Sequence, residues 1–219
     1  MGEVELHKPS LELVIHSVFV FYGDASTPSL SGQIARDIQD HWNEPAAQVR
    51  HKGTPYRVIF RIEGRYEPDI APETIWYNTN PALNFFRIEA FSEKHISFVD
   101  GLKSNTGYFK LDNLLNNSTT AAHEYGHTLG LDHPRQLDIR GRGQPGIMYP
   151  RGTICDPEFQ YDVNALPLQA GGTLDPYKRK VLQSDVDDLR LDRLRFNSND
   201  MAVIGDFSNM YHDKHFPDQ

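Results

Sequence analysis

The sequence predicts an α+β fold in a single domain, and two observations lead to this prediction. Strand-like and helical patterns alternate in the first third of the chain, and the pattern turns from strand-like to helical again near residue 118. The chain has 219 residues, of which 38% are hydrophobic and 11% aromatic. This is enough apolar material for one sizeable core, so we expect one domain over residues 1–219.

The first two elements are a buried strand and an amphipathic helix. Leu13–Tyr22 is rich in β-branched and aromatic residues, as is typical of a strand. A helix is expected over Leu30–Glu44, with Ser31 as its cap and Pro45 as its end. Apolar side chains recur along it at four-residue spacing and predict its buried face: Ile34, Ile38 and Trp42.

Four further strands are expected before residue 118. Tyr56–Tyr66 alternates apolar and charged residues, which indicates a strand with one face in the core. After a proline-rich stretch, strand patterns appear at Asn84–Phe91, His95–Val99 and Tyr108–Leu111. The turn residues around the last two are typical of a sheet edge, and Ile96–Val99 is the part expected to pair with an extended peptide.

A second helix follows in the segment STTAAHEYGHTLG. Ser118 or Thr119 is expected to cap it, and Gly130 to end it in the left-handed conformation. His123 and His127 lie one helical turn apart, so their side chains share one face and are able to bind the same metal ion. This helix is therefore the predicted centre of the chemistry.

Two more residues complete the predicted metal site. His133 follows the helix end and adds a third imidazole, which leaves a tetrahedral zinc ion one open position. Glu124 adjoins the first histidine and is placed to act on a metal-bound water without being a ligand. A lone histidine is most often a surface or hydrogen-bonded core residue, but the full pattern HExxHxxGxxH makes a chance arrangement improbable.

Together with the later segment Gly146–Pro150 (GIMYP), this pattern resembles the metzincin clan of zinc peptidases, and within it the matrixins. The resemblance covers Ser118–Leu194 well. It implies a metzincin or zincin-like catalytic domain with a twisted, mostly parallel five-stranded sheet, an antiparallel edge strand and three main helices. An upper subdomain would span 1–130, an irregular lower subdomain 131–196, and a C-terminal extension 197–219.

The resemblance also implies roles for residues around the metal. Met148 would lie beneath the zinc site, with Gly130 as the second structural residue, and Tyr149 and Pro150 are candidates for the substrate pocket. Tyr149 directly follows the methionine and is not assigned as a metal ligand. Asp185 would lie beneath the methionine turn, although the segment Leu182–Leu189 is read equally well as a capped, solvated helix start.

The sequence departs from the matrixin pattern in several places. The loop Pro134–Pro145 is longer, carries three arginines, and is either a wall of the cleft or a flexible insertion. Arg151-Gly152 replaces an aromatic position in the pocket wall, so no subsite preference is carried over. Cys155 is expected to be a packed or surface thiol. One catalytic zinc ion is predicted, and calcium is not.

The final segment is harder to interpret. His212, Asp213 and His215 are able in principle to bind a metal or to fold back on the active site. A polar tail, ordered or frayed, is the favoured interpretation.

The function expected from these residues is that of a zinc-dependent endopeptidase, a hydrolase that cleaves internal peptide bonds through a zinc-bound water activated by Glu124. The alternatives are a toxin or effector metallopeptidase domain of a larger delivered protein and a zinc-stabilised binding module without turnover. The same zinc chemistry acting on a non-peptide amide is a further possibility, because specificity resides in loops.

Composition limits the classes of molecule that we expect this protein to bind. The 22 basic and 30 acidic residues give a net charge of −8 without a basic stripe, so we expect a protein or peptide substrate and no nucleic acid. No apolar run is long enough for a membrane span, and we expect a monomer. Residues 1–10 do not read as a secretory signal, so localisation is left open, with a non-classical export or delivery route suspected.

Overall fold

The computed structural model describes residues 1–94 and 96–217. Four neighbouring strands run parallel at the centre of its sheet, and a fifth, β6 (Phe98–Val99), pairs antiparallel with β7 (Thr106–Lys110) at one edge. The expected parallel arrangement with an antiparallel edge strand is thus present. The predicted strand His95–Val99 is shorter, and His95 lies outside the described residues. The parallel strands are, in spatial order, β4 (Thr54–Tyr66), β2 (Glu12–Tyr22), β5 (Leu83–Glu89) and β7.

The expected total of five strands is wrong, because the sheet formed by the described residues has eight. β2 is long enough for two neighbours on one edge: Glu12–His16 pairs with β1, and Val18–Tyr22 pairs with β5. The additional strands all pair antiparallel; they are β1 (Gly2–His7) on β2, β8 (Met201–Ile204) on β1, and β3 (Gln48–His51) on β4.

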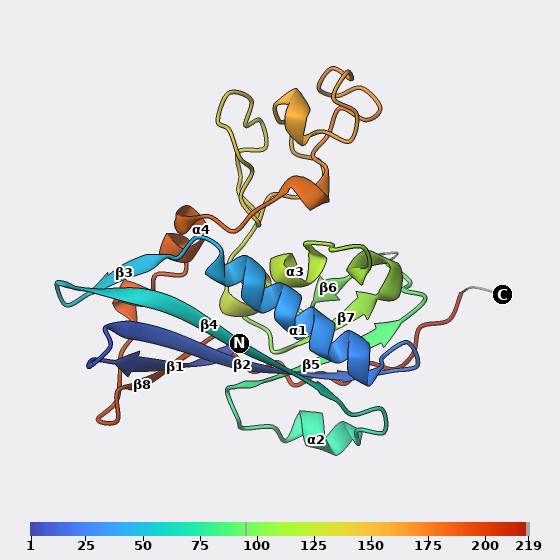
Figure 1. The fold of residues 1–219 in the computed structure, drawn as a ribbon. Helices are drawn as coiled ribbons and strands as arrows, with labels where there is room; N and C mark the ends of the chain where they lie inside the picture. Colours follow the sequence, from blue (N-terminus) through green and yellow to red (C-terminus); the bar gives the residue numbers. More distant parts are fainter. Residues whose placement is uncertain (95, 218–219) are drawn as a thin grey trace.

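Helices lie on both faces of the sheet (Figure 1). α1 (Pro28–Asn43) and α3 (Thr120–Leu129) lie on one face, and the short α2 (Pro72–Trp76) lies on the other. The Thr27 hydroxyl accepts a hydrogen bond from the Leu30 amide at 3.1 Å, so the predicted Ser31 cap is wrong. Proline has no backbone N–H and fits the first turn of a helix, where that group would lack a partner. With Pro28 in this position, α1 begins two residues before the expected start at Leu30.

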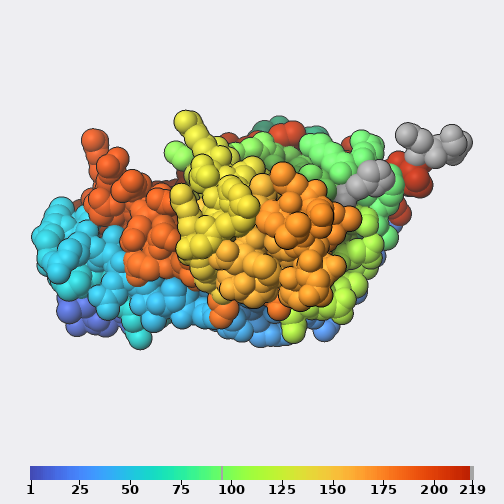
Figure 2. Space-filling model, turned by 90° about the horizontal axis from the view of Figure 1, so that it is seen from above, coloured from blue at the N-terminus to red at the C-terminus, as the bar shows by residue number. Residues whose placement is uncertain are grey.

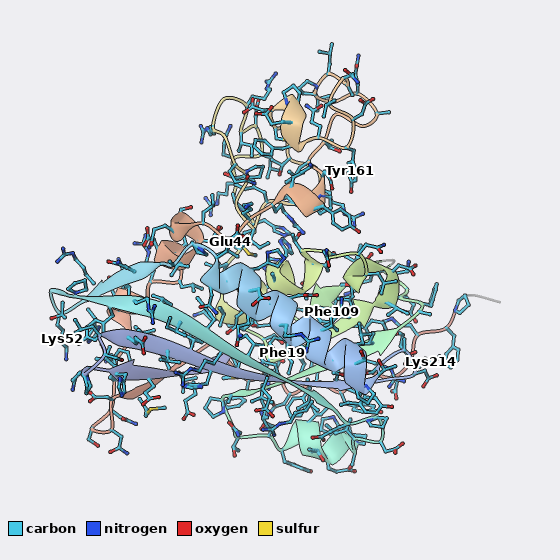
Figure 3. All side chains as sticks on the ribbon, viewed as in Figure 1. Phe19, Glu44, Lys52, Phe109, Tyr161 and Lys214 are labelled. Carbon is cyan, nitrogen blue, oxygen red and sulfur yellow. The ribbon has the colours of Figure 1, made fainter. Side chains whose placement is uncertain are left out.

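Alternation along β2 divides the core between the two faces. Phe19 and Phe21 pack in the main core with the buried faces of α1 and α3, whereas Val20 and Tyr22 pack with Ile75 of α2. Figure 3 shows Phe19 and Phe109 between the sheet and the helices.

The two main helices are also tied together directly. The Trp42 indole nitrogen donates a hydrogen bond to the Ala122 carbonyl at 3.0 Å, and the Trp42 side chain is fully buried. This contact holds α3, the helix that carries the histidines, against α1.

Residues 134–178 form an irregular lobe above α3 (Figure 1), and from above the yellow and orange lobe covers the middle of the molecule (Figure 2). Its small core contains Ile139, Cys155 and Leu174, so Cys155 is a packed thiol as expected. α4 (Gln183–Asp188) follows the lobe, and short 3₁₀ turns complete the elements: η1 (Leu111–Leu114), η2 (Pro157–Phe159), η3 (Pro176–Lys178) and η4 (Leu191–Arg193).

The C-terminal segment packs along the sheet rather than at the predicted metal site. After β8, His212 Nε2 lies 2.8 Å from a carboxylate oxygen of Asp100. The His215 ring stacks on Tyr108 with 4.1 Å between ring centroids. Among the described residues, no helix has both the length and the apolar character needed to cross a membrane.

Candidate metal centre

α3 begins with hydrogen bonds from two neighbouring hydroxyls. Ser118 Oγ accepts from the Thr120 amide at 3.1 Å, whereas the Thr119 hydroxyl donates to the Pro176 carbonyl at 2.7 Å and so ties the helix start to the lobe. Of the two predicted candidates, Thr119 occupies the cap position but makes no capping hydrogen bond with its side chain, while Ser118 precedes the cap and binds the first amide of the helix.

The end of α3 reverses the chain and orients the second histidine. Gly130 has φ +105°, and the Leu131 amide donates to the Gly126 carbonyl at 2.9 Å, which closes the helix as predicted. His127 Nδ1 lies 2.7 Å from the Leu131 carbonyl. The same reversal brings His133 back towards the helix.

The three histidines converge on one point. Their candidate ligand nitrogens all lie within 4.8 Å of one another, and His123 Nε2 is 3.1 Å from His133 Nε2. Two nitrogens about 2.0–2.1 Å from a tetrahedral zinc ion lie roughly 3.3–3.4 Å apart. His123, His127 and His133 are thus the right distance apart to hold one metal ion.

Backbone carbonyls fix the proton positions on two of these rings. His123 Nδ1 lies 2.7 Å from the Ile147 carbonyl, and a carbonyl only accepts, so this nitrogen carries the hydrogen. The Leu131 carbonyl does the same for His127. Each Nε2 is left with a free lone pair, which is the tautomer that metal-binding histidines use.

Burial keeps the three imidazoles neutral. It is the main cause that lowers the pKa of His123 well below its ordinary value, and it also lowers the pKa of His127 and His133. The nearby Arg179 charge acts in the same direction on each. Neutral nitrogen donors at these spacings fit zinc, which favours imidazole ligands.

Glu124 lies beside these rings in a buried environment. Burial raises the pKa of its carboxyl to about 8, although the Arg179 charge and a backbone hydrogen bond from Val99 lower it. Val99 belongs to the edge strand β6, so Glu124 lies between the histidine cluster and that strand.

The segment after the third histidine packs against α3 and binds Asp185. A Cβ atom on Gly126 of α3 would lie 2.3 Å from Met148 Sδ, so Met148 packs directly against the helix. The Asp185 carboxylate accepts from the Leu182 amide at 2.7 Å and from the Ile147 amide at 3.4 Å. Asp185 therefore caps α4 and also binds the methionine turn, the turn of residues 146–149 around Met148; because Asp185 is buried, it does not mark a solvated helix start.

A cleft of about 350 Å³ surrounds the histidines and Glu124. Pro150 lines it, but Tyr149 does not; the Tyr149 side chain packs against the lobe core instead. The three arginines of the loop 134–145 are also absent from its lining among the described residues, so that loop is not a wall of the cleft. Its lining residues are Ile96, Ser97, Phe98, Val99, Asn113, Thr120, His123, Glu124, His127, His133, Pro150, Arg151 and Arg179.

Arg179 is the functional candidate that sequence reasoning missed. Its side chain is 5% exposed, and its Nη1 lies 3.0 Å from His123 Nδ1 and donates to the Tyr149 carbonyl at 3.0 Å. Burial lowers the pKa of its guanidinium to about 10, so the group is still charged at neutral pH. No local motif marks this arginine, because its partners come from α3 and the methionine turn.

No family model and no curated protein matches the sequence. Among solved structures, archaemetzincin from Methanopyrus kandleri aligns with a TM-score of 0.42 at 12% identity, covering 81% of this chain and 95% of that chain. Myroilysin aligns with a TM-score of 0.30 at 16% identity, covering 56% of this chain and 51% of that chain. At these scores, the function of the present chain has to be inferred from its own residues.

Proposed function

We propose that this protein is a zinc-dependent endopeptidase in which His123, His127 and His133 hold one catalytic zinc ion and Glu124 is the general base. One observation carries the proposal: three neutral imidazoles with converging ligand atoms share a cleft with a buried glutamate and an edge strand. A binding module would not require Glu124 at this position.

The chemistry divides between the metal and the chain. When bound by three histidines, zinc supplies an open coordination position, polarises a carbonyl and lowers the pKa of water. Glu124 would take the proton of the attacking water and return it to the departing amine, so one carboxylate acts as base and then as acid.

The edge strand β6 supports an extended peptide as substrate. Phe98 and Val99 pair with β7 on one side and line the cleft on the other. On the cleft side, the Val99 backbone already donates a hydrogen bond to Glu124, and the rest of the edge pairs with no other described strand. An unpaired strand edge binds a peptide through main-chain hydrogen bonds. A substrate bound in this way would run past the metal in both directions, which favours cleavage of internal bonds.

The test is cleavage of a mixed peptide library, followed by mass spectrometry, with wild type and Glu124→Ala at matched zinc content. We expect internal cuts by wild type and a loss of rate of about 10²–10⁴-fold or more in the variant. A zinc-loaded wild type that makes no internal cuts would exclude the proposal and favour a binding module. Equal cleavage by both proteins would exclude Glu124 as the base.

A further inference from the structure

The cleft contains a positive charge that the proposed reaction does not use. We infer that this charge binds a carboxylate next to the scissile bond, supplied by an acidic side chain of the peptide. A C-terminal carboxylate in the same place would instead make the enzyme a carboxypeptidase, and the binding experiment separates the two sources. This inference rests on the proposed function and names its substrate class. The residues that carry it are Arg179 and Arg151, which line the cleft beside the histidines.

Arg179 is held in place on several sides. Its Nη2 donates to the Thr119 hydroxyl at 2.9 Å, its Nη1 donates to the Tyr149 carbonyl at 3.0 Å, and its Nε lies 3.4 Å from the Pro176 carbonyl. The planar guanidinium is therefore fixed between the start of α3 and the lobe. A fixed arginine binds a carboxylate with little further loss of side-chain freedom.

Arg179 lines the cleft, and its guanidinium keeps some hydrogen-bonding capacity. Nη2 carries a second N–H for which the described residues offer no acceptor. Nη1 donates to the Tyr149 carbonyl and otherwise lies 3.0 Å from His123 Nδ1, which has its own hydrogen for the Ile147 carbonyl.

Among the described residues, no carboxylate lies within ion-pairing distance of Arg179. Glu124 and Asp175 act on it only through their charge. A buried cation without an ion-pair partner is costly, and a bound carboxylate would complete its shell.

Arg151 adds a second positive charge at the same cleft. It directly follows Pro150, is exposed, and is near enough to repel the Arg179 charge. It has no ion pair with another described residue. The two arginines therefore make one side of the cleft suitable for an anion, whereas Ile96 and Phe98 line the side of β6.

A purely structural role for Arg179 makes a different prediction. If Arg179 only ties α3 to the lobe, its loss lowers stability or zinc affinity but leaves the charge preference of the cleft unchanged. Arg151 has no such tie among the described residues, so reversal of its charge tests the preference without the structural contribution of Arg179.

The experiment measures binding rather than turnover. Peptide hydroxamates, which bind zinc directly, are made with a glutamate-like, a leucine-like or a lysine-like side chain next to the zinc-binding group. Each is prepared with an amidated C-terminus, and the leucine-like probe also with a free C-terminal carboxylate, so that the two sources of the anion are separated. Dissociation constants are measured with zinc-loaded full-length wild type, Arg151→Glu and Arg179→Gln, after the zinc content of each has been confirmed.

We expect a carboxylate-bearing probe to bind wild type at least about 10-fold more tightly than the amidated leucine-like probe, the scale of one charge-assisted hydrogen bond. Arg151→Glu should weaken binding of the carboxylate-bearing probe and strengthen binding of the lysine-like probe. Arg179→Gln should remove the preference for the carboxylate-bearing probe. Equal or tighter binding of the amidated leucine-like or lysine-like probe by wild type would overturn the inference, as would a preference that both variants retain. The binding measurement does not require turnover, so the two proposals can fail separately. A carboxylate preference without peptide cleavage would contradict the endopeptidase and support the anion site. Peptide cleavage without the preference would support the endopeptidase and contradict the anion site.

Discussion

His133 is held less firmly than the other two candidate ligands. It is exposed, whereas the rings of His123 and His127 are each oriented by a backbone carbonyl. We therefore predict that His133→Ala lowers zinc affinity by at least the roughly 10–100-fold that loss of an outer partner costs. The metal-free protein should keep its free energy of unfolding within about 0.5 kcal/mol.

A zinc-competition titration and urea unfolding of the metal-free protein measure the two effects. His7→Ala is the matched control, because His7 is also exposed but belongs to β1. Unchanged zinc affinity in His133→Ala would exclude this residue as a ligand.

Gly126 permits the close contact between α3 and the methionine turn. Alanine would gain about 1 kcal/mol in helix propensity, but its Cβ would meet Met148 Sδ at 2.3 Å. Overpacking of a core costs typically 1–3 kcal/mol. We predict that Gly126→Ala lowers the free energy of unfolding by roughly 1 kcal/mol and also weakens zinc binding.

A double-mutant cycle with Met148→Ala checks the mechanism, since removal of the Met148 side chain should reduce the cost of Gly126→Ala. Additive costs would show that the contact with Met148 is not the cause.

At the scale of elements, Asp185 joins α4 to the methionine turn, and its burial gives a pH dependence. Burial raises the pKa of its carboxyl from 3.8 to about 6, although two backbone amides lower it. The folded protein therefore keeps this proton where the unfolded chain has lost it, so the contribution of Asp185 to stability falls as the pH rises from about 4 to about 6.

We predict that, as the pH rises from about 4 to about 6, the free energy of unfolding of wild type falls relative to that of Asp185→Asn. Above pH of about 6 the difference should be constant. Urea unfolding at a series of pH values measures it, and the difference between the two proteins removes the contribution of other carboxylates. A difference independent of pH would contradict the raised pKa.

The elements that sequence analysis predicted best are those with a local pattern. The apolar spacing of Ile34, Ile38 and Trp42 gave the buried face of α1, and the histidine spacing with Gly130 gave α3 and its end. The cap of α1 was misassigned because Thr27 lies before the apolar run.

Strand β1 alternates apolar and charged residues and pairs with the neighbouring β2, so it has a local pattern that was overlooked. Strand β8 was not predicted because it is short and its partner β1 lies far away in the chain. Met201–Ile204 pairs with Gly2–Glu5, a contact that no local pattern reveals. Arg179 was missed for the same reason, since its partners Thr119 and Tyr149 are remote in sequence.

For the whole molecule, a metal at this site would join α3, the reversed chain and, through Ile147, the lobe. A ligand that binds only the folded state stabilises it by about 2.7 kcal/mol at a free concentration 100 times its dissociation constant. For a protein of this size, that corresponds to roughly 5–10 °C in the midpoint of thermal unfolding.

We predict a fall of that order when a chelator removes zinc from wild type, measured by scanning calorimetry. The control is His133→Ala under the same conditions, which should show a much smaller fall. An equal fall in both proteins would indicate that the chelator acts elsewhere.

A zinc titration of the metal-free protein, with bound zinc and peptide cleavage measured in the same samples, tests whether zinc makes this protein a peptidase. We expect cleavage to be absent without metal, to rise in proportion to bound zinc and to reach its maximum at about one ion per chain. Cleavage that persists without zinc, or a fully zinc-loaded protein that cuts no peptide, would contradict the proposed zinc-dependent cleavage.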